Sequence, residues 1–386
     1  MMEKIKVLSV FGTRPEAIKM APLVKVLKDT TEIEAKICVT AQHREMLDQV
    51  LKLFHLEPEE DLDIMSQRQT LSDITCRALT GLEQILIKDK PHLVLVHGDT
   101  TTTFAGSLAA FYQQVKVGHV EAGLRTFQKY SPYPEEMNRK LTGALTDLHF
   151  APTQRAEENL LKEGTDPGTV FVTGNTVIDA LKTTVRPDYV FEEKSLNHLD
   201  YKGQRLLLVE AHRRENLGRP MERICLALKD LVAEFPDVGI VFPVHKNPLV
   251  RETVFGTLGD MDRVHLLEPL GTADFHNLIA RCHLLLTDSG GIQEEAPSLG
   301  KPVLVLREVT ERPEAVEAGT VRLLGTARDS VYRGTAQLLQ EENEDYLAMA
   351  HAVNPYGDGK ASLRIRDIIL HSFGFSPELP PPFVPE

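Results

Sequence analysis

Two adjacent glycines in the second half of the chain lie where backbone amides could bind an anion. The stretch Asp288-Ser289-Gly290-Gly291 stands between the apolar runs 284–286 and 303–305, a pattern that predicts a strand, a turn, a short helix and a strand. Backbone N–H groups at such a turn and helix start bind phosphate oxygens well. The stretch indicates a phosphate-bearing ligand, although a tight turn without a ligand would need the same glycines.

Charged side chains also follow the ends of several other predicted strands. In parallel α/β sheets ligands bind outside the carboxyl ends of the strands, so side chains there can reach a ligand. A solvated surface charge has no reason to prefer that edge. We expect one site, in a cleft between two domains. Its candidate residues are Arg14, Lys19, Asp99, Glu121, His212, Arg213, His245 and Arg312.

The composition excludes several other classes of protein. A net charge of −13 argues against a nucleic-acid partner, which needs a basic face. No apolar run approaches the roughly 20 residues of a membrane span, and the start enters a strand rather than a signal peptide, so we expect a cytoplasmic location. The four cysteines form no Cys-x-x-Cys pair and the histidines no His-Glu-x-x-His motif, which predicts buried free thiols and no metal site.

Strand-like and helix-like segments alternate through both halves of the chain, which predicts the α/β class with two Rossmann-like domains and parallel sheets. Residues 1–182 form the first predicted domain and 203–360 the second, separated by a polar stretch. A helix over 361–376 is expected to join the first domain. The proline-rich tail 377–386 is expected to be poorly ordered.

Seven blocks, in order along the chain, carry a resemblance to a known family. They are FGTRPEAIK (11–19), HGDTTT (97–102), HVEAGLRT (119–126), PEEMNR (134–139), HRREN (212–216), DSGGIQEEAP (288–297) and TERPE (310–314). Together they resemble the non-hydrolysing UDP-N-acetylglucosamine 2-epimerases of the bacterial type, from about residue 5 to 372. The resemblance implies a GT-B-like fold, a homodimer, and interconversion of UDP-GlcNAc and UDP-ManNAc without a metal or other cofactor.

The chemistry of that reaction explains the residue types. The C2 proton lies beside an acetamido nitrogen and is not acidic enough for simple removal. The resemblance implies elimination: UDP leaves C1 while a base takes the C2 proton, and UDP then adds back to 2-acetamidoglucal. This needs carboxylates at C2 and cations at the diphosphate. The resemblance supplies Asp99, Glu121 and Glu135 as the carboxylates, without saying which is the C2 base, and His212 at the diphosphate.

Two of these carboxylates have a structural alternative. Asp99 could cap the helix that begins near Thr101, as aspartates often do. Glu135 could pair with Arg139 one helical turn later.

The resemblance also implies a set of substrate-binding residues. Glu295 would accept the ribose hydroxyls, and Phe275 would lie beside uracil or simply belong to the core. Pro297 cannot donate to a helical ladder, so the helix behind the glycines should be short or kinked. The full set is Arg14, Lys19, Arg213, His245, Phe275, Ser289, Gly290, Gly291, Glu295 and Arg312.

Some bacterial members bind a second UDP-GlcNAc as an activator, and Gln42, Glu45 and Arg68 stand at positions resembling that site. Glu45 replaces the glutamine of regulated members, and its charge should weaken binding of a diphosphate. Three other functions stay open from the residues: a hydrolysing epimerase that releases ManNAc and UDP, a GT-B glycosyltransferase, and a sugar-nucleotide sensor.

Overall fold

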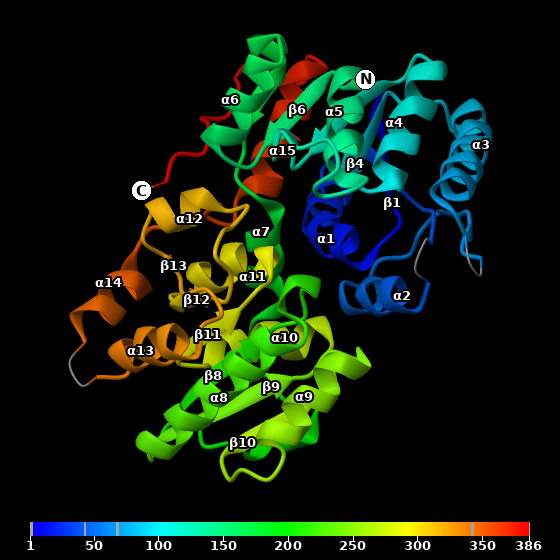
Figure 1. Ribbon diagram of the computed structural model, residues 1–386. Helices are drawn as coiled ribbons and strands as arrows, with labels where there is room; N and C mark the ends of the chain where they lie inside the picture. Colours follow the sequence, from blue (N-terminus) through cyan, green and yellow to red (C-terminus); the bar gives the residue numbers. More distant parts are fainter. Residues whose placement is uncertain (1–2, 42–43, 67–68, 341–342, 386) are drawn as a thin grey trace. The chain divides into compact units, whose positions relative to one another are not determined.

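The computed structural model describes residues 3–41, 44–66, 69–340 and 343–385. They form two compact units, which Figure 1 colours along the chain. Unit 1 contains the residues up to Thr183 together with Tyr356–Pro385, and unit 2 contains Thr184–Pro355. Among the described residues, no helix combines the length and the apolar character that a bilayer span requires.

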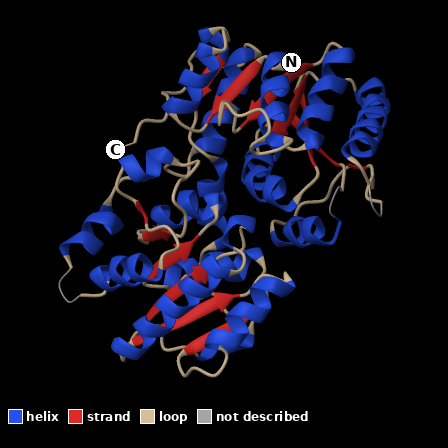
Figure 2. Ribbon diagram, in the orientation of Figure 1, coloured by secondary structure: helices blue, strands red, loops and turns tan. Residues whose placement is uncertain are grey.

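Unit 1 is a parallel sheet with the strand order β3-β2-β1-β4-β5-β6-β7. The order reverses between β1 and β4, and in open α/β sheets such a reversal is where ligands bind. The helices lie beside the strands in Figure 2. The elements are β1 (Ile5–Phe11), α1 (Arg14–Lys28), β2 (Ile33–Val39), α2 (Arg44–Leu53), β3 (Glu60–Asp61), α3 (Leu71–Asp89), β4 (Leu93–His97), α4 (Thr101–Tyr112), β5 (Lys116–Val120), α5 (Glu135–Leu145), β6 (Leu148–Ala151), α6 (Gln154–Lys162), β7 (Val170–Val172), α7 (Thr176–Thr184) and α15 (Ala361–Ser372).

Helix α1 shows how the sequence builds this unit. Pro15 lies in the first turn, where its missing N–H costs nothing, and a capping box joins Thr13 to Glu16. Met20, Leu23, Val24 and Leu27 form its buried face. Ile365, Ile368 and Ile369 of α15 belong to the same apolar core. Burial of each such side chain stabilises the fold by about 1.5–3 kcal/mol.

The proline-rich tail is ordered on unit 1, which corrects the prediction of a poorly ordered end. Phe383 is buried, and its backbone amide donates to the Val172 carbonyl at the end of β7. The Arg364 guanidinium lies over its ring. Composition predicted disorder because prolines dominate the tail, but one aromatic side chain and one strand-like hydrogen bond are enough to dock it.

Unit 2 repeats the design, with the strand order β10-β9-β8-β11-β12-β13. Its reversal lies between β8 and β11, where Glu210 and Thr287 are register partners. The elements are β8 (Arg205–Glu210), α8 (Arg219–Glu234), β9 (Val238–Pro243), α9 (Pro248–Leu258), β10 (Val264–Leu267), α10 (Thr272–Arg281), β11 (Leu284–Thr287), α11 (Gly290–Glu295), β12 (Val303–Val305), α12 (Pro313–Glu317), β13 (Val321–Leu323), α13 (Arg328–Leu338) and α14 (Glu344–His351).

The polar stretch predicted to separate the domains packs on unit 2 instead. Asp274 of α10 accepts hydrogen bonds from the Tyr189 hydroxyl and from the amides of Glu192 and Glu193. Phe191 is buried and stacks with Tyr201. The hydrogen bonds of a buried carboxylate thus hold a segment whose charge content resembled that of a linker.

The cysteines follow the prediction at three of four positions. Cys38, Cys225 and Cys282 are buried free thiols, whereas Cys76 is exposed. Cys76 lies on α3, whose buried stripe is Ile74, Ala78, Leu82, Ile85 and Leu86. A residue two positions after Ile74 is turned away from that stripe by the 3.6-residue helical period.

Candidate active site

A buried glutamate joins the two loops at the reversal of the unit 1 sheet. Glu16 accepts hydrogen bonds from the amides of Gly12 (3.0 Å) and Thr13 (2.8 Å), after β1, and from the Thr100 hydroxyl (2.7 Å), after β4. Burial raises the pKa of Glu16, and these donors oppose that shift. The bonds hold the turn that carries Arg14 beside the turn that carries Asp99.

Glu121, directly after β5, is a buried carboxylate surrounded by donors. Its backbone is left-handed, with φ 63°, a conformation that costs a non-glycine residue energy and recurs at functional sites. Its side chain accepts from Arg139 Nη2 (3.1 Å), Asn175 Nδ2 (3.0 Å) and the Lys19 ammonium. Burial alone would raise the pKa of Glu121, but Lys19 and Arg139 hold it well below its usual range. Glu121 is therefore ionised at neutral pH.

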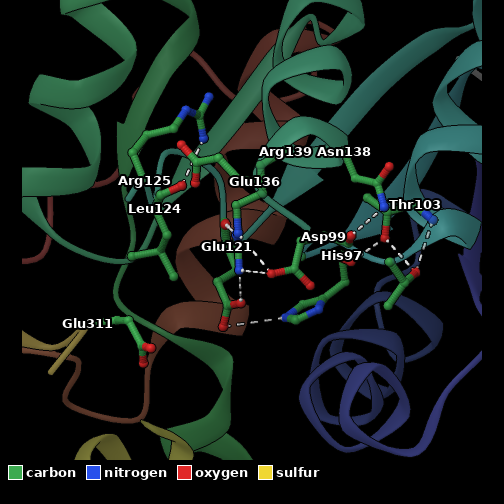
Figure 3. Close-up of polar contacts among 12 residues, drawn as sticks. His97, Asp99, Thr103, Glu121, Leu124, Arg125, Glu136, Asn138, Arg139 and Glu311 are labelled. Atoms are coloured by element: carbon green, nitrogen blue, oxygen red, sulfur yellow. Dashed lines mark hydrogen bonds and ion pairs between the residues drawn. The ribbon is translucent and has the colours of Figure 1, made fainter. Parts of the chain in front are cut away.

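Arg139, on α5, connects two of the predicted carboxylates, as Figure 3 shows. Its Nε donates to Asp99 Oδ2 (3.0 Å) and its Nη1 to the Glu121 carbonyl (2.8 Å). Asn138 adds a hydrogen bond to the Asp99 carbonyl oxygen (2.9 Å). Because Thr100 is the N-cap of α4, the alternative of Asp99 as the helix cap does not hold. The charge of Arg139 also lowers the pKa of Glu135, so the pairing with Glu135 stands beside the contacts of Arg139 with Asp99 and Glu121.

Glu135, the first residue of α5, has the opposite protonation preference to Glu121. Its Oε2 is buried and has no hydrogen-bond partner among the described residues. Burial raises the pKa of Glu135, and the negative charge of Asp99 adds to the shift. Two carboxylates whose surroundings move their pKa values apart are the usual arrangement of an acid and a base.

In unit 2, a buried aspartate shapes the turn after β8. Asp288 accepts from the amides of His212 (3.0 Å) and Arg213 (2.9 Å) and from Asn216 Nδ2 (2.8 Å). The His212 ring stacks on His245, with centroids 5.1 Å apart, and its Nδ1 lies 2.7 Å from Glu210. The hydrogen bond to Glu210 raises the pKa of His212. The turn therefore presents, at the reversal of the unit 2 sheet, an imidazole whose protonation Glu210 favours.

An open pocket lies at this turn. Its lining is dominated by cations, which suits an anionic ligand. The residues that line it are His212, Arg213, Arg214, Glu215 and Ser289.

The glycine turn predicted from the sequence lies beside the pocket. Ser289 precedes α11, whose six residues give way to the 3₁₀ helix Ala296–Leu299, so the helix is short, as Pro297 predicted. Arg312 Nε donates to the buried Glu294. Glu295 lies 3.7 Å from His276 of α10, which also carries the half-buried Phe275. These contacts bring Ser289, Gly290, Gly291, Glu295 and Arg312 to one side of unit 2.

For the remaining predicted residues the structure gives fewer contacts or lacks a described side chain. Arg14 is half-buried at the start of α1. Of the proposed regulatory positions, Gln42 and Arg68 lie outside the described residues, and Glu45 falls in α2 without a described side chain.

Four residues that contact the predicted ones received no role at the site from the sequence argument: Arg139, Asn175, Glu210 and Asp288. Arg139 and Asn175 do not directly follow strands, so the rule that found the others could not find them. Glu210 had a signal, since it stands two residues before His212 and alternate residues share a side of a strand.

The donor atoms of Glu210, His212 and Asp288 lie within 4.8 Å of one another, a spacing that metal sites also show. In this turn, hydrogen bonds account for the short distances among the three side chains. Asp288 already accepts three N–H donors, and His212 donates its Nδ1–H to Glu210. The set does not fit a metal without loss of those bonds.

Two Rossmann-like α/β units with parallel sheets define the GT-B-like class. The family model described as UDP-N-acetylglucosamine 2-epimerase matches residues 25–370, and the chain belongs to this family.

Individual relatives agree along the whole length. The chain is 59% identical over 383 residues to the UDP-N-acetylglucosamine 2-epimerase of Bacillus subtilis, covering 99% of each chain. The S. aureus MnaA–UDP co-structure matches with a TM-score of 0.87 and 53% identity, over 98% of this chain and 100% of that one. The Neisseria meningitidis UDP-GlcNAc 2-epimerase bound to UDP-GlcNAc gives 0.86 and 50%, over 95% and 100%.

Proposed function

We propose that this chain interconverts UDP-GlcNAc and UDP-ManNAc by the non-hydrolysing route. A base removes the C2 proton while the C1–oxygen bond breaks, so that UDP departs and C1 and C2 become doubly bonded. UDP oxygen then attacks C1 and a proton returns to C2 on the opposite face. Every atom of the substrate except the C2 hydrogen, which exchanges with solvent, is kept, and no water is consumed.

The opposed protonation of Glu121 and Glu135 carries the proposal. Epimerisation needs one group able to take a proton and another able to give one, on opposite faces of the sugar. Glu121 is ionised beside Lys19 and Arg139, and Glu135 is the carboxyl whose surroundings favour the proton. Asp99, tied to Arg139, is the third carboxylate of the set. A transferase or a sensor has little use for three carboxylates gathered around one arginine.

In this proposal unit 2 binds the nucleotide. His212 and Arg213 supply positive charge to the diphosphate, whose charge increases as the C1–oxygen bond breaks. Backbone amides at Ser289–Gly291 supply uncharged donors, and Glu295 suits the two ribose hydroxyls because a carboxylate has two acceptor oxygens. The complexes of the S. aureus and N. meningitidis relatives with UDP and UDP-GlcNAc support a nucleotide-sugar ligand.

Proton NMR of UDP-GlcNAc with the protein in deuterated water tests the proposal. We expect UDP-ManNAc with deuterium at C2, and deuterium entering C2 of recovered UDP-GlcNAc. Free ManNAc together with UDP would instead identify a hydrolysing enzyme. Unchanged substrate, or turnover only with an added sugar acceptor, would contradict epimerisation.

The matched variants are Glu121→Gln and Glu158→Gln, the latter at an exposed position of α6. Glu121→Gln should lower turnover by at least about 10³-fold, within the range for loss of a general acid or base, with UDP affinity within about twofold of wild type. Glu158→Gln should behave as wild type. Loss of UDP binding in Glu121→Gln, measured by calorimetry, would assign Glu121 a structural role.

A further inference from the structure

Glu210 and His212 are in contact at the end of β8. Glu210 is the last residue of the strand, and His212 follows in the turn that Asp288 holds. Glu210 Oε1 accepts the Nδ1–H of His212 at 2.7 Å. Nε2 of the same ring makes no hydrogen bond to any described residue, and the ring lines the open pocket.

A second hydrogen bond fixes Glu210 itself. Thr287, its register partner on β11, donates its hydroxyl to Glu210 Oε2 at 3.0 Å and accepts the Ser289 amide at 3.0 Å. Glu210 is thus joined to both walls of the pocket, to His212 on one side and to the Ser289 turn on the other. A carboxylate with both oxygens engaged holds its partner in one orientation.

The charged groups that face His212 come from several elements. Glu210 and Asp288 are the acidic ones, at 2.7 and 3.9 Å from Nδ1. His245 stacks on the ring after β9, and Arg213 follows it in the chain. Asp288 is committed to three N–H donors, so Glu210 is the group free to respond to the charge on the ring.

From these contacts we infer that Glu210 is a positioning residue for His212. Glu210 accepts Nδ1–H, holds the ring in its cationic form, and so presents Nε2–H to an oxygen of the bound diphosphate. The inference rests on the proposed function only in naming that diphosphate. Its consequence for the reaction is that the returning UDP keeps a charged donor while the sugar is a free glycal.

Three substitutions separate orientation from charge. Glu210→Gln keeps an acceptor for Nδ1–H but removes the negative charge, Glu210→Asp keeps the charge on a shorter side chain, and Glu210→Ala removes both. Glu234→Gln is the matched control, because Glu234 ends α8 at the opposite, amino edge of the sheet and is exposed. Thermal unfolding of each variant checks that it is folded. If Glu210→Ala does not fold, Glu210→Gln, which changes the side-chain shape least, carries the test.

The first readout is the titration of His212 in protein with isotope-labelled histidine, its NMR signal assigned by loss in His212→Asn. We expect the midpoint to fall by about one pH unit in Glu210→Gln, to recover at least half of that in Glu210→Asp, and to stay unchanged in Glu234→Gln. An unchanged midpoint in Glu210→Gln would overturn the inference.

The second readout is the affinity for UDP, measured by calorimetry at about pH 5.5 and about pH 8. Charged His212 strengthens diphosphate binding below its pKa, so Glu210→Gln should bind about tenfold more weakly at the higher pH and within about twofold of wild type at the lower. An equal loss at both pH values would overturn the inference and leave the proposed function intact. A wild-type chain that binds UDP but never epimerises UDP-GlcNAc would overturn the proposed function and leave the inference about Glu210 intact.

Discussion

At the scale of single residues, the unit 1 site depends on which buried groups hold a charge. Glu121 is ionised because the charges of Lys19 and Arg139 outweigh its burial. His97, whose Nε2 lies 3.8 Å from Glu121, is neutral because burial lowers its pKa to about 4, although Glu121 opposes that shift. A neutral histidine beside a carboxylate that already has two cationic partners leaves the site without excess positive charge.

The first prediction concerns acid stability. The folded pKa of His97 is lower than its unfolded value near 6.5, so His97 contributes stability above about pH 6.5 that is lost as the pH falls toward 4. Between about pH 7 and pH 4.5 this amounts to roughly 2–3 kcal/mol of unfolding free energy. His97→Gln should remove that part of the loss, measured by urea unfolding at the two pH values.

His198→Gln is the control, since His198 is exposed and should leave the pH dependence as in wild type. An acid loss of the same size in wild type and His97→Gln would show that His97 is not held neutral by the fold.

The carboxylates of the site were predictable, but the cation that organises them was not. Asp99 and Glu121 directly follow strands and belong to sequence blocks that resemble the family. Arg139 lies within α5, and sequence spacing suggested only a local partner, Glu135. Its contacts with Asp99 and Glu121 span 40 and 18 residues, and such long-range pairings appear only once the chain is folded.

At the scale of elements, the turn after β5 determines how the chain leaves the sheet at Glu121. Glu121 and Gly123 both have positive φ, so the chain reverses sharply between β5 and the next segment. Gly123 also leaves no room for a side chain, because an added Cβ would lie 2.2 Å from the Ala156 carbonyl oxygen. The position thus requires glycine for its backbone conformation and for its contact with α6.

The second prediction compares the cost of an added Cβ in this turn with its cost in a turn that has space for it. Gly123→Ala combines a left-handed backbone with a clash and should lower the unfolding free energy by at least about 2 kcal/mol. Gly164→Ala has nearly the same φ, 88° against 87°, but nothing within 4 Å of the added Cβ, so it should cost only about 1 kcal/mol. Chemical denaturation of the two variants gives the comparison.

Equal costs for Gly123→Ala and Gly164→Ala would mean that the turn relaxes and that the contact with Ala156 does not constrain it. The β-strand and helix order could be read from apolar periodicity, whereas this turn could not, because a close approach across 33 positions leaves no local signal.

At the scale of the whole molecule, unit 1 is discontinuous in sequence. The chain leaves it near Thr183 and returns at Tyr356, and α15 then packs on α1. The alternation of strands and helices predicted two Rossmann-like folds. The exact boundaries depended on tertiary contacts, such as those of Asp274 and Phe383, which composition does not reveal.

The third prediction concerns the docked tail. Phe383→Ala should lower the unfolding free energy of unit 1 by about 2–3 kcal/mol, since it removes a buried aromatic side chain that contacts Arg364. Val384→Ala, at the neighbouring exposed position, should change it by less than about 0.5 kcal/mol. Hydrogen exchange followed by mass spectrometry would locate the loss.

Faster exchange confined to residues 377–385 in Phe383→Ala would mean that the tail docks without stabilising the sheet. Faster exchange that extends to β7 and α15 is the expected result.

The return of the chain to unit 1 also determines which unit can fold first during synthesis. Unit 2 is contiguous in the described residues, so all its strands have been synthesised before Tyr356 is added. Unit 1 must wait for α15, and until then the apolar face of α1 that Ile365, Ile368 and Ile369 cover stays open to water and to chaperones. A released chain truncated between Pro355 and Ala361 should therefore fold unit 2 and leave unit 1 unfinished.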